Sequence, residues 1–204
     1  MATPPRYIED GVYYHVYNRG NRKQQIFLQD RDYERFLEKV LEYKKKYPVK
    51  IVAYCLMPNH FHFLIQQLSP NALSRFLSNL CNSHSRYFNV KYKTVGSLYQ
   101  GRFKAKKVDK DEYLVHLSRY IHLNPVDLFS YLGKGVSDQL QLYRWSSLPL
   151  YLFGSSNELV NPKEILNYFS SRDPLKDYKD FIISNIHLKL DPVINHLAFN
   201  EETS

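Results

Sequence analysis

Strand-like apolar segments alternate along this chain with segments whose apolar residues recur every three or four positions. The two patterns divide its first two thirds into predicted strands and helices. Residues 11–20, GVYYHVYNRG, are rich in Val and Tyr and predict a strand that closes on the turn-prone residues 18–21. Residues 30–47 instead place apolar side chains at three- and four-residue steps, which predicts an amphipathic helix that stops before Pro48. The apolar stripe of this helix consists of Tyr33, Phe36, Leu37, Val40 and Leu41.

Two continuous apolar runs come next and predict a β-hairpin. VKIVAYCLM (49–57) and HFHFLIQQ (60–67) have the composition of buried strands, and Pro58-Asn59 supplies a tight turn between them. Residues 73–92 return to helical spacing, and residues 97–109 predict a further strand. Residues 111–124 predict a helix capped by Asp109 or Asp111, which should end near Asn124 because Pro125 follows.

The order of these elements predicts the fold class. Strand, helix, hairpin, helix, strand and helix in succession favour an α+β fold, in which helices pack on one antiparallel sheet. Residues 1–150 form the predicted main domain. The pattern weakens beyond Trp145, and residues 151–204 are expected to be a helical appendage, with helix starts at Asn161-Pro162 and Asp173-Pro174.

Composition narrows the class of protein. The chain has 204 residues, of which 44% are hydrophobic and 15% aromatic, enough to form a substantial core. It contains no run of ~18 apolar residues and no secretory signal pattern, so we expect no membrane association and a cytoplasmic location. Cys55 and Cys81 lack CxxC spacing and are expected to be buried thiols. A net charge of +8 and a pI near 9.3 favour a polyanionic partner.

The second strand of the predicted hairpin carries two histidines. Because side chains alternate along a strand, His60 and His62 project from one face and Phe61 and Phe63 from the other. Two imidazoles ~7 Å apart along a strand can converge on one divalent ion when a third group closes the site. The alternative is a strand with two incidental histidines, and the spacing leaves both interpretations open.

The helix at 111–124 places polar groups beside its buried stripe. That stripe consists of Leu114, Leu117 and Ile121. At ~100° per residue, Tyr113, Tyr120 and Asn124 fall along one border of the stripe. A phenol and an amide there can reach the sheet face on which the histidines project. Alternatively, Tyr120 is an aromatic residue at the rim of the core and Asn124 simply ends the helix.

Two motifs together resemble a known family. MPNHFHFLI (57–65), followed about sixty residues later by YIHLNPV, resembles the REP-associated tyrosine transposases, which belong with the single-tyrosine HUH (His-hydrophobic-His) transposases. YHVYNRGNRKQQIF, LYQGRFKA and RWSS agree, so the resemblance spans most of residues 10–150. It implies a ferredoxin-like, RRM-like antiparallel sheet (the HUH palm). It also implies metal-binding catalytic histidines at His60 and His62, a nucleophile at Tyr120, a third metal-side residue at Asn124, and Mg²⁺ or Mn²⁺ as cofactor.

The same resemblance implies an activity and a partner. The expected function is that of a transposase, a metal-dependent endonuclease and strand transferase that forms a covalent 5′-phosphotyrosine on single-stranded or hairpin DNA. Such a protein would associate with the nucleoid and act as a monomer or homodimer. The alternative is a domesticated relative that binds hairpin DNA without cutting it.

Basic and amide residues outside these motifs are candidates for DNA contact. They are Asn18, Arg19, Asn21 and Arg22 in the predicted early turn, and Arg102, Lys104, Lys106 and Lys107 in the later strand. An ordinary polar turn and a solvated basic strand are the alternatives. His84, Arg86 and Tyr87 lie on a helix that faces either the substrate or the core and solvent. His116 and His122 are expected to be structural or exposed rather than ligands.

Two other protein classes compete with this interpretation. Histidine-triad nucleotide hydrolases also carry His-hydrophobic-His on a strand, but they need a third histidine at position 64, which is Leu64 here. A non-catalytic RRM-like nucleic-acid-binding protein would stack bases on Tyr and Phe, and would not need Tyr120 together with His60 and His62.

Overall fold

A four-stranded antiparallel sheet forms the centre of the computed structural model, which describes residues 8–129, 135–169, 172–184 and 186. The strands are β1 (Tyr13–Arg19), β2 (Val49–Met57), β3 (His60–Gln67) and β4 (Lys104–Val108), in the spatial order β2-β3-β1-β4. Helix α1 (Asp30–Lys46) follows β1, and helix α2 (Ala72–Tyr92) follows β3. This β-α-β-β-α-β succession is that of ferredoxin-like folds. The predicted α+β class and antiparallel sheet are therefore confirmed.

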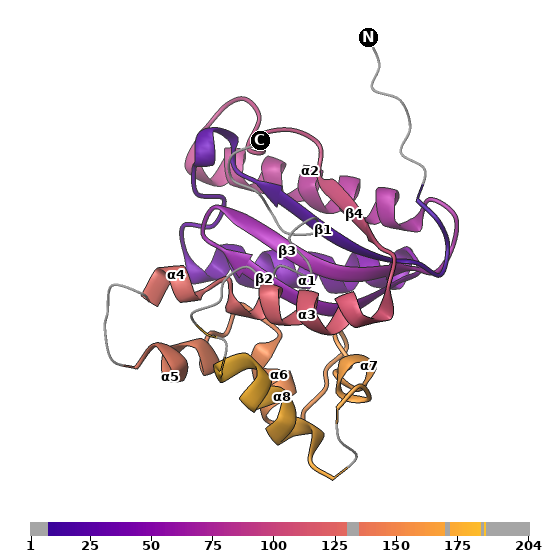
Figure 1. Ribbon diagram of the computed structural model, residues 1–204. Coiled ribbons are helices and arrows are strands. Elements are labelled where there is room, and N and C mark those ends of the chain that lie inside the picture. The colour runs from indigo at the N-terminus through magenta and orange to yellow at the C-terminus, as the bar shows by residue number, and fades with distance from the viewer. Residues whose placement is uncertain (1–7, 130–134, 170–171, 185, 187–204) are drawn as a thin grey trace.

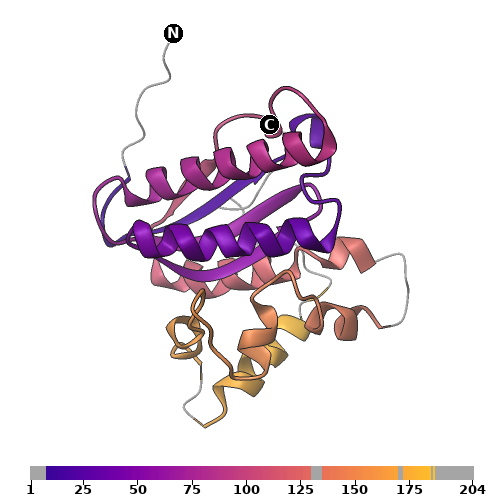
Figure 2. The same ribbon diagram turned by 180° about the vertical axis from the view of Figure 1, so that it is seen from behind.

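The sheet separates two layers of helices (Figure 1). Helices α1 and α2 lie side by side over one face, as Figure 2 shows from behind. Phe61 and Phe63 project to that face, where both rings contact Phe36 of α1. Helix α3 (Asp111–Leu123) covers the opposite face. Side chains alternate between the two faces along a strand, so this second face carries every other side chain of β3 from His60 onward. Directly opposed residues of antiparallel strands project to the same face, so the β1 residues opposite these positions project there as well.

The predicted helices form largely where the periodicity places them. In α1, Tyr33, Phe36 and Val40 are buried, and Leu37 and Leu41 are partly buried against the core. In α3 the predicted stripe is buried at all three positions, and Asn124 is the C-terminal cap. The predicted N-terminal cap of α3 is wrong. Asp111 is already the first helical residue, and the cap is Lys110, which makes no side-chain capping bond.

The residues after α3 form a third layer, which packs on the outer side of that helix. This layer contains short helices α4 (Val126–Phe129), α5 (Val136–Gln141), α6 (Leu148–Leu152) and α7 (Lys163–Leu166), and the longer α8 (Pro174–Ile183). Its first part runs beside β2, where Leu56 N–H donates to the Trp145 carbonyl over 2.9 Å and Ser147 N–H to the Tyr54 carbonyl over 3.0 Å. The outer layer therefore touches both the sheet and α3.

The predicted division of the chain can be placed on this architecture. The boundary at residue 150 falls inside α6, and buried residues on both sides of it share one core with α3. Asp173 caps α8 by accepting the Lys176 N–H over 3.1 Å, as predicted, whereas α7 starts one residue late with Pro162 as its cap. Residues 187–204 of the predicted appendage lie outside the described residues. Cys55 and Cys81 are buried free thiols, as predicted.

Candidate active site

The two histidines at the start of β3 project together onto the α3 face. His62 is fully buried and His60 is half-buried, and their ring centroids lie 4.9 Å apart with the planes at 85°. Asn59 Oδ1 lies 2.6 Å from His60 Nδ1, which leaves the His60 Nε2 atom to face α3. The sequence-based expectation that both imidazoles share one face is confirmed.

Asn124, at the end of α3, presents its amide oxygen to these rings. Its Nδ2 group donates to the Tyr120 carbonyl over 2.8 Å, and this bond orients the carboxamide. The Oδ1 atom consequently lies 3.5 Å from His60 Nε2. Two imidazoles and one amide oxygen thus converge from a strand and a helix that are about sixty residues apart in the chain.

This donor set fits a divalent cation. Imidazole nitrogens are common ligands of first-row transition-metal ions, and amide oxygens are ligands of Mg²⁺, Ca²⁺ and Mn²⁺. Within the described parts of the chain no group of three or more His, Cys, Asp and Glu side chains is arranged to hold a metal ion. A cation here would therefore need the Asn124 oxygen as its third protein ligand. The assignment of His60, His62 and Asn124 as ligands stays a prediction.

Tyr120 lies directly against the histidines. Its side chain is buried, and its ring meets the rings of His15 and His62 edge-on, with centroid distances of 5.7 Å to each. The contact exists because α3 packs its Tyr120 border against the middle of β1 and β3. A phenol and the imidazole pair, far apart in sequence, therefore meet in one place, and the role of Tyr120 as nucleophile stays a prediction.

Sequence reasoning missed two residues of this cluster, His15 and Tyr17 of β1. His15 Nε2 lies 2.9 Å from His62 Nδ1, both side chains are fully buried, and their ring planes are within 21° of each other, with centroids 5.1 Å apart. Tyr17 is opposite His62 in the β1–β3 pair, with ring centroids 5.9 Å apart. The run VYYHVYNR reads as an ordinary strand, so only the pairing of β1 with β3 reveals these neighbours.

Burial determines the charge state of His62. Removal from water lowers the pKa of His62 well below its ordinary value, and the nearby His60 and His15 lower it further, whereas the side chain of Asn124 acts in the opposite direction. His62 is therefore neutral at physiological pH. Neutral imidazole is the form that binds a metal ion.

Four of the predicted DNA-contacting residues occupy the end of β1 and the loop after it. Asn18 and Arg19 were predicted to lie in a turn. They lie instead at the end of β1, where both are buried. Asn18 Nδ2 donates to the Gly101 carbonyl over 3.2 Å, and the Arg19 guanidinium donates twice to Gln100 Oε1, over 3.2 and 3.1 Å. Asn21 and Arg22 lie in the 3₁₀ turn η1 (Asn21–Lys23), where Arg22 is exposed. Asn18 and Arg19 thus bind the loop before β4, which corrects the predicted position of the turn.

The predicted basic strand divides between the two faces of the sheet. Lys104 and Lys106 are opposite Tyr17 and His15, so they project to the α3 face, and Lys106 Nζ lies 5.8 Å from the centre of the Tyr17 ring. Lys107 projects to the other face and forms an ion pair with Glu9 over 2.7 Å. Arg102 is exposed in the preceding loop. Of these four candidates for DNA contact, Lys104 and Lys106 therefore share a sheet face with the histidines.

A buried polar network holds α3 from its outer side. His122 Nδ1 and Nε2 lie 2.7 Å from the Tyr178 hydroxyl and from Ser147 Oγ, respectively. The Tyr178 hydroxyl also lies 3.0 Å from Ser118 Oγ, one turn earlier in α3. The network connects the helix that carries Tyr120 to α8 and to the segment beside β2. His122 is structural, in agreement with the sequence-based expectation.

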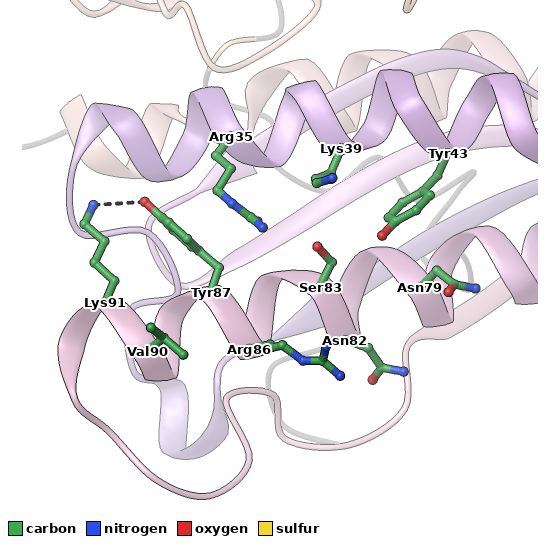
Figure 3. A pocket seen from close by; sticks show the side chains of 10 residues that line it. All are labelled: Arg35, Lys39, Tyr43, Asn79, Asn82, Ser83, Arg86, Tyr87, Val90 and Lys91. Atoms are coloured by element: carbon green, nitrogen blue, oxygen red, sulfur yellow. Dashed lines mark hydrogen bonds between the residues drawn. The ribbon is translucent and has the colours of Figure 1, made fainter.

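On the opposite face of the sheet, α1 and α2 enclose a polar groove of about 640 Å³ (Figure 3). Arg35, Lys39, Arg86 and Lys91 contribute four cationic groups, and none of the described lining residues is acidic. The Arg35 guanidinium lies 4.3 Å above the Tyr87 ring. Arg86 and Tyr87, for which the sequence left two orientations open, therefore line a cavity, whereas His84 is buried and bonds to the Ile26 carbonyl.

One family model and two solved structures match this chain. Residues 9–124 match the family described as "Transposase IS200 like". The structure of the REP-associated tyrosine transposase bound to a REP hairpin has a similar fold, with a TM-score of 0.56, 20% identity, and coverage of 79% of this chain and 92% of that one. A presumed transposase from Deinococcus radiodurans R1 gives a TM-score of 0.41 and 16% identity over 59% of this chain and 95% of that one. No curated protein sequence matches.

These findings settle the family. The matched segment covers more than half of the 204 residues and ends at Asn124, so it includes both histidines and Tyr120. None of the helices in the described ranges is long and apolar enough to cross a membrane. The resemblance drawn from the two central motifs is confirmed: the chain belongs to the IS200-like transposases, a family of DNA-processing enzymes.

Proposed function

We propose that this transposase is a metal-dependent endonuclease and strand transferase that cuts single-stranded DNA beside a hairpin and forms a covalent 5′-phosphotyrosine at Tyr120. The observation that supports this proposal most directly is the edge-on contact of the Tyr120 ring with His62, beside the Asn124 oxygen that faces His60. A hairpin substrate is suggested by the REP hairpin bound to the relative of similar fold.

In the proposed reaction one P–O bond forms for each P–O bond that breaks, and the net charge does not change. The Tyr120 oxygen attacks the scissile phosphorus, a P–O bond to tyrosine forms, and the P–O3′ bond breaks. The phenolic proton leaves to solvent, and the departing oxygen takes up a proton to become a 3′-hydroxyl. Because the new phosphodiester keeps the energy of the old one, a 3′-hydroxyl of another strand can reverse the step without ATP. Cutting and strand transfer are therefore one reaction in two directions.

The surrounding residues prepare this step. His60, His62 and Asn124 would hold Mg²⁺ or Mn²⁺, which would offset the negative charge of the phosphate. The buried contacts of α3 hold the phenol close to these groups before DNA binds. Such positioning reduces the entropy that the attack must otherwise lose.

The first test follows the direction of the covalent bond. A hairpin oligonucleotide with a single-stranded flank, incubated with the protein and Mn²⁺, should give a denaturation-resistant protein–DNA adduct only when the label is at the 3′ end. The 5′-labelled strand should instead give a shorter free fragment ending in a 3′-hydroxyl. His60→Ala should lose the adduct and retain hairpin binding. Adduct formation with the 5′ label would reverse the proposed polarity, and binding without cleavage by the wild type would favour the domesticated alternative.

The groove between α1 and α2 supports binding of the DNA backbone on the far face of the sheet. Lys39 pairs with Glu42 and Lys91 with Asp32, but Arg35 and Arg86 form no ion pair in the part of the chain that the structure describes. Guanidinium groups match phosphate oxygens in a bidentate geometry. Asp32 accepts the Tyr87 hydroxyl over 2.9 Å, and Tyr87 supports Arg35, so one of these groups is already positioned.

Charge reversal at Arg86 should therefore weaken binding. Arg86→Glu should raise the Kd for the hairpin at least about tenfold, and Arg86→Ala should flatten the plot of log K against log salt by about one unit. Binding is measured by fluorescence anisotropy in EDTA, so that cleavage does not interfere. Lys179→Glu is the matched control, because Lys179 is exposed on α8 and the substitution changes the net charge equally. Equal effects of both reversals would remove the groove from the proposal.

A further inference from the structure

His15 occupies a position that the reaction outlined above does not use. It is fully buried in the centre of β1, opposite Leu64 of β3 and on the same face as His62. Its Nε2 atom lies 2.9 Å from His62 Nδ1, and the Tyr120 ring meets its ring edge-on at 5.7 Å. A buried polar side chain in the middle of a sheet is costly unless its hydrogen bond contributes something that an apolar residue would not.

The hydrogen bond between the two rings permits only two proton arrangements. Two neutral imidazoles can share it with the hydrogen on His62 Nδ1 or with the hydrogen on His15 Nε2. In the second arrangement the proton of His62 must be on Nε2, and that nitrogen cannot bind a cation. In the first, His62 Nδ1–H donates to His15, and the lone pair of the His62 ring is on Nε2.

The proposed role of His62 as a ligand requires the first arrangement, and we propose that His15 is a positioning residue: it accepts the Nδ1–H of His62 and so fixes the tautomer and ring orientation in which His62 Nε2 can bind a divalent cation. Histidines that bind metals commonly donate their other ring N–H to an acceptor, which orients them. Here the acceptor is a second histidine, whose ring plane lies within 21° of that of His62 and which the Tyr120 ring meets edge-on. The inference rests on the proposed role of His62 as a ligand.

Two substitutions separate positioning from packing. His15→Phe keeps an aromatic ring among Tyr17, His62 and Tyr120 but removes the acceptor, whereas His15→Asn can still accept through its side-chain oxygen. By calorimetry on the DNA-free protein, His15→Phe should bind Mn²⁺ about 10- to 100-fold more weakly than wild type, and His15→Asn should recover part of the loss. Circular dichroism verifies that both variants are folded. Wild-type Mn²⁺ affinity in a folded His15→Phe would overturn the proposal.

The tautomer itself can be observed. Nitrogen-15 NMR of histidine-labelled protein without metal should show His62 with its proton on Nδ1, and this signature should be lost in His15→Phe. A proton on Nε2 of His62 in the wild type would also overturn the proposal. These readouts do not require DNA cleavage. If His15→Phe weakens Mn²⁺ binding but the wild type forms no adduct, the positioning role stands and the proposed function fails. If the wild type forms the adduct and His15→Phe binds Mn²⁺ as well as the wild type does, the proposed function stands and the positioning role fails.

Discussion

Tyr120→Phe should abolish the covalent adduct while leaving the fold and DNA binding intact. The substitution removes one oxygen atom and keeps the ring that packs edge-on against His15 and His62, so the core around α3 should not change. Loss of a nucleophile typically lowers the rate of such reactions by at least about 10⁴-fold. The measurement is the yield of denaturation-resistant adduct on the 3′-labelled hairpin, with the Kd for the same hairpin in EDTA as the control for binding.

The structure supplies a competing phenol that makes this experiment discriminating. The Tyr17 ring lies 5.9 Å from His62, nearly as close as Tyr120, and it is also buried. Tyr17→Phe should form the adduct at close to the wild-type rate. If adduct formation is lost in Tyr17→Phe and retained in Tyr120→Phe, the nucleophile belongs to β1 and the assignment of roles must be exchanged. Equal adduct yields from both variants and the wild type would exclude both residues as the nucleophile.

Tyr178→Ala should strongly lower the stability of the fold. Tyr178 is fully buried in α8, and its hydroxyl bonds to Ser118 and His122 of α3. Removing a large buried aromatic side chain typically lowers the free energy of unfolding by about 3–5 kcal/mol. The expected result, measured by urea denaturation, is a loss in that range. Adduct formation should fall as well, because α3 loses its outer support.

Two further substitutions identify the source of this loss. Tyr178→Phe removes only the hydroxyl and should cost about 1–3 kcal/mol, since it leaves buried polar partners unsatisfied. Tyr168→Ala truncates a tyrosine that is 49% exposed in the same layer, and should change the free energy of unfolding by no more than about 0.5 kcal/mol. If Tyr178→Ala lowers the free energy of unfolding by no more than Tyr168→Ala does, the outer layer does not support α3.

Most of the secondary structure could be predicted because it depends on local pattern. The helices α1, α2 and α3 each have an apolar period that identifies their buried side without reference to the rest of the chain. The hairpin is recognisable from two continuous apolar runs separated by Pro58-Asn59. The end of β1 was placed wrongly for a related reason. Asn18, Arg19 and Gly20 look like a turn, but pairing with β3 as far as His60 extends the strand over the first two, and tertiary pairing overrides local preference.

The site could be predicted only in part, because its geometry is set by contacts between distant segments. Periodicity indicated that His60 and His62 share a face and that Tyr120 borders a buried stripe, but not that these two faces meet. That connection came from the resemblance between motifs. His15 and Tyr17 gave no local signal, since their importance arises from the order β2-β3-β1-β4, which places β1 beside β3. The network of Ser118 and His122 with Tyr178 was hidden for the same reason.

This network has a consequence for the order of events on the ribosome. A nascent chain that has emerged as far as Asn124 already contains Tyr120 and both histidines of β3. Ser147 and Tyr178, which hold His122 and Ser118, follow 25 and 60 positions after their respective partners. Because folding during synthesis proceeds from the amino end and distant contacts form late, the helix that carries Tyr120 acquires its outer support only after Tyr178 has been synthesised. A nascent chain that does not yet include Tyr178 would therefore already contain Tyr120, His60 and His62 but lack the contacts that hold α3 from its outer side.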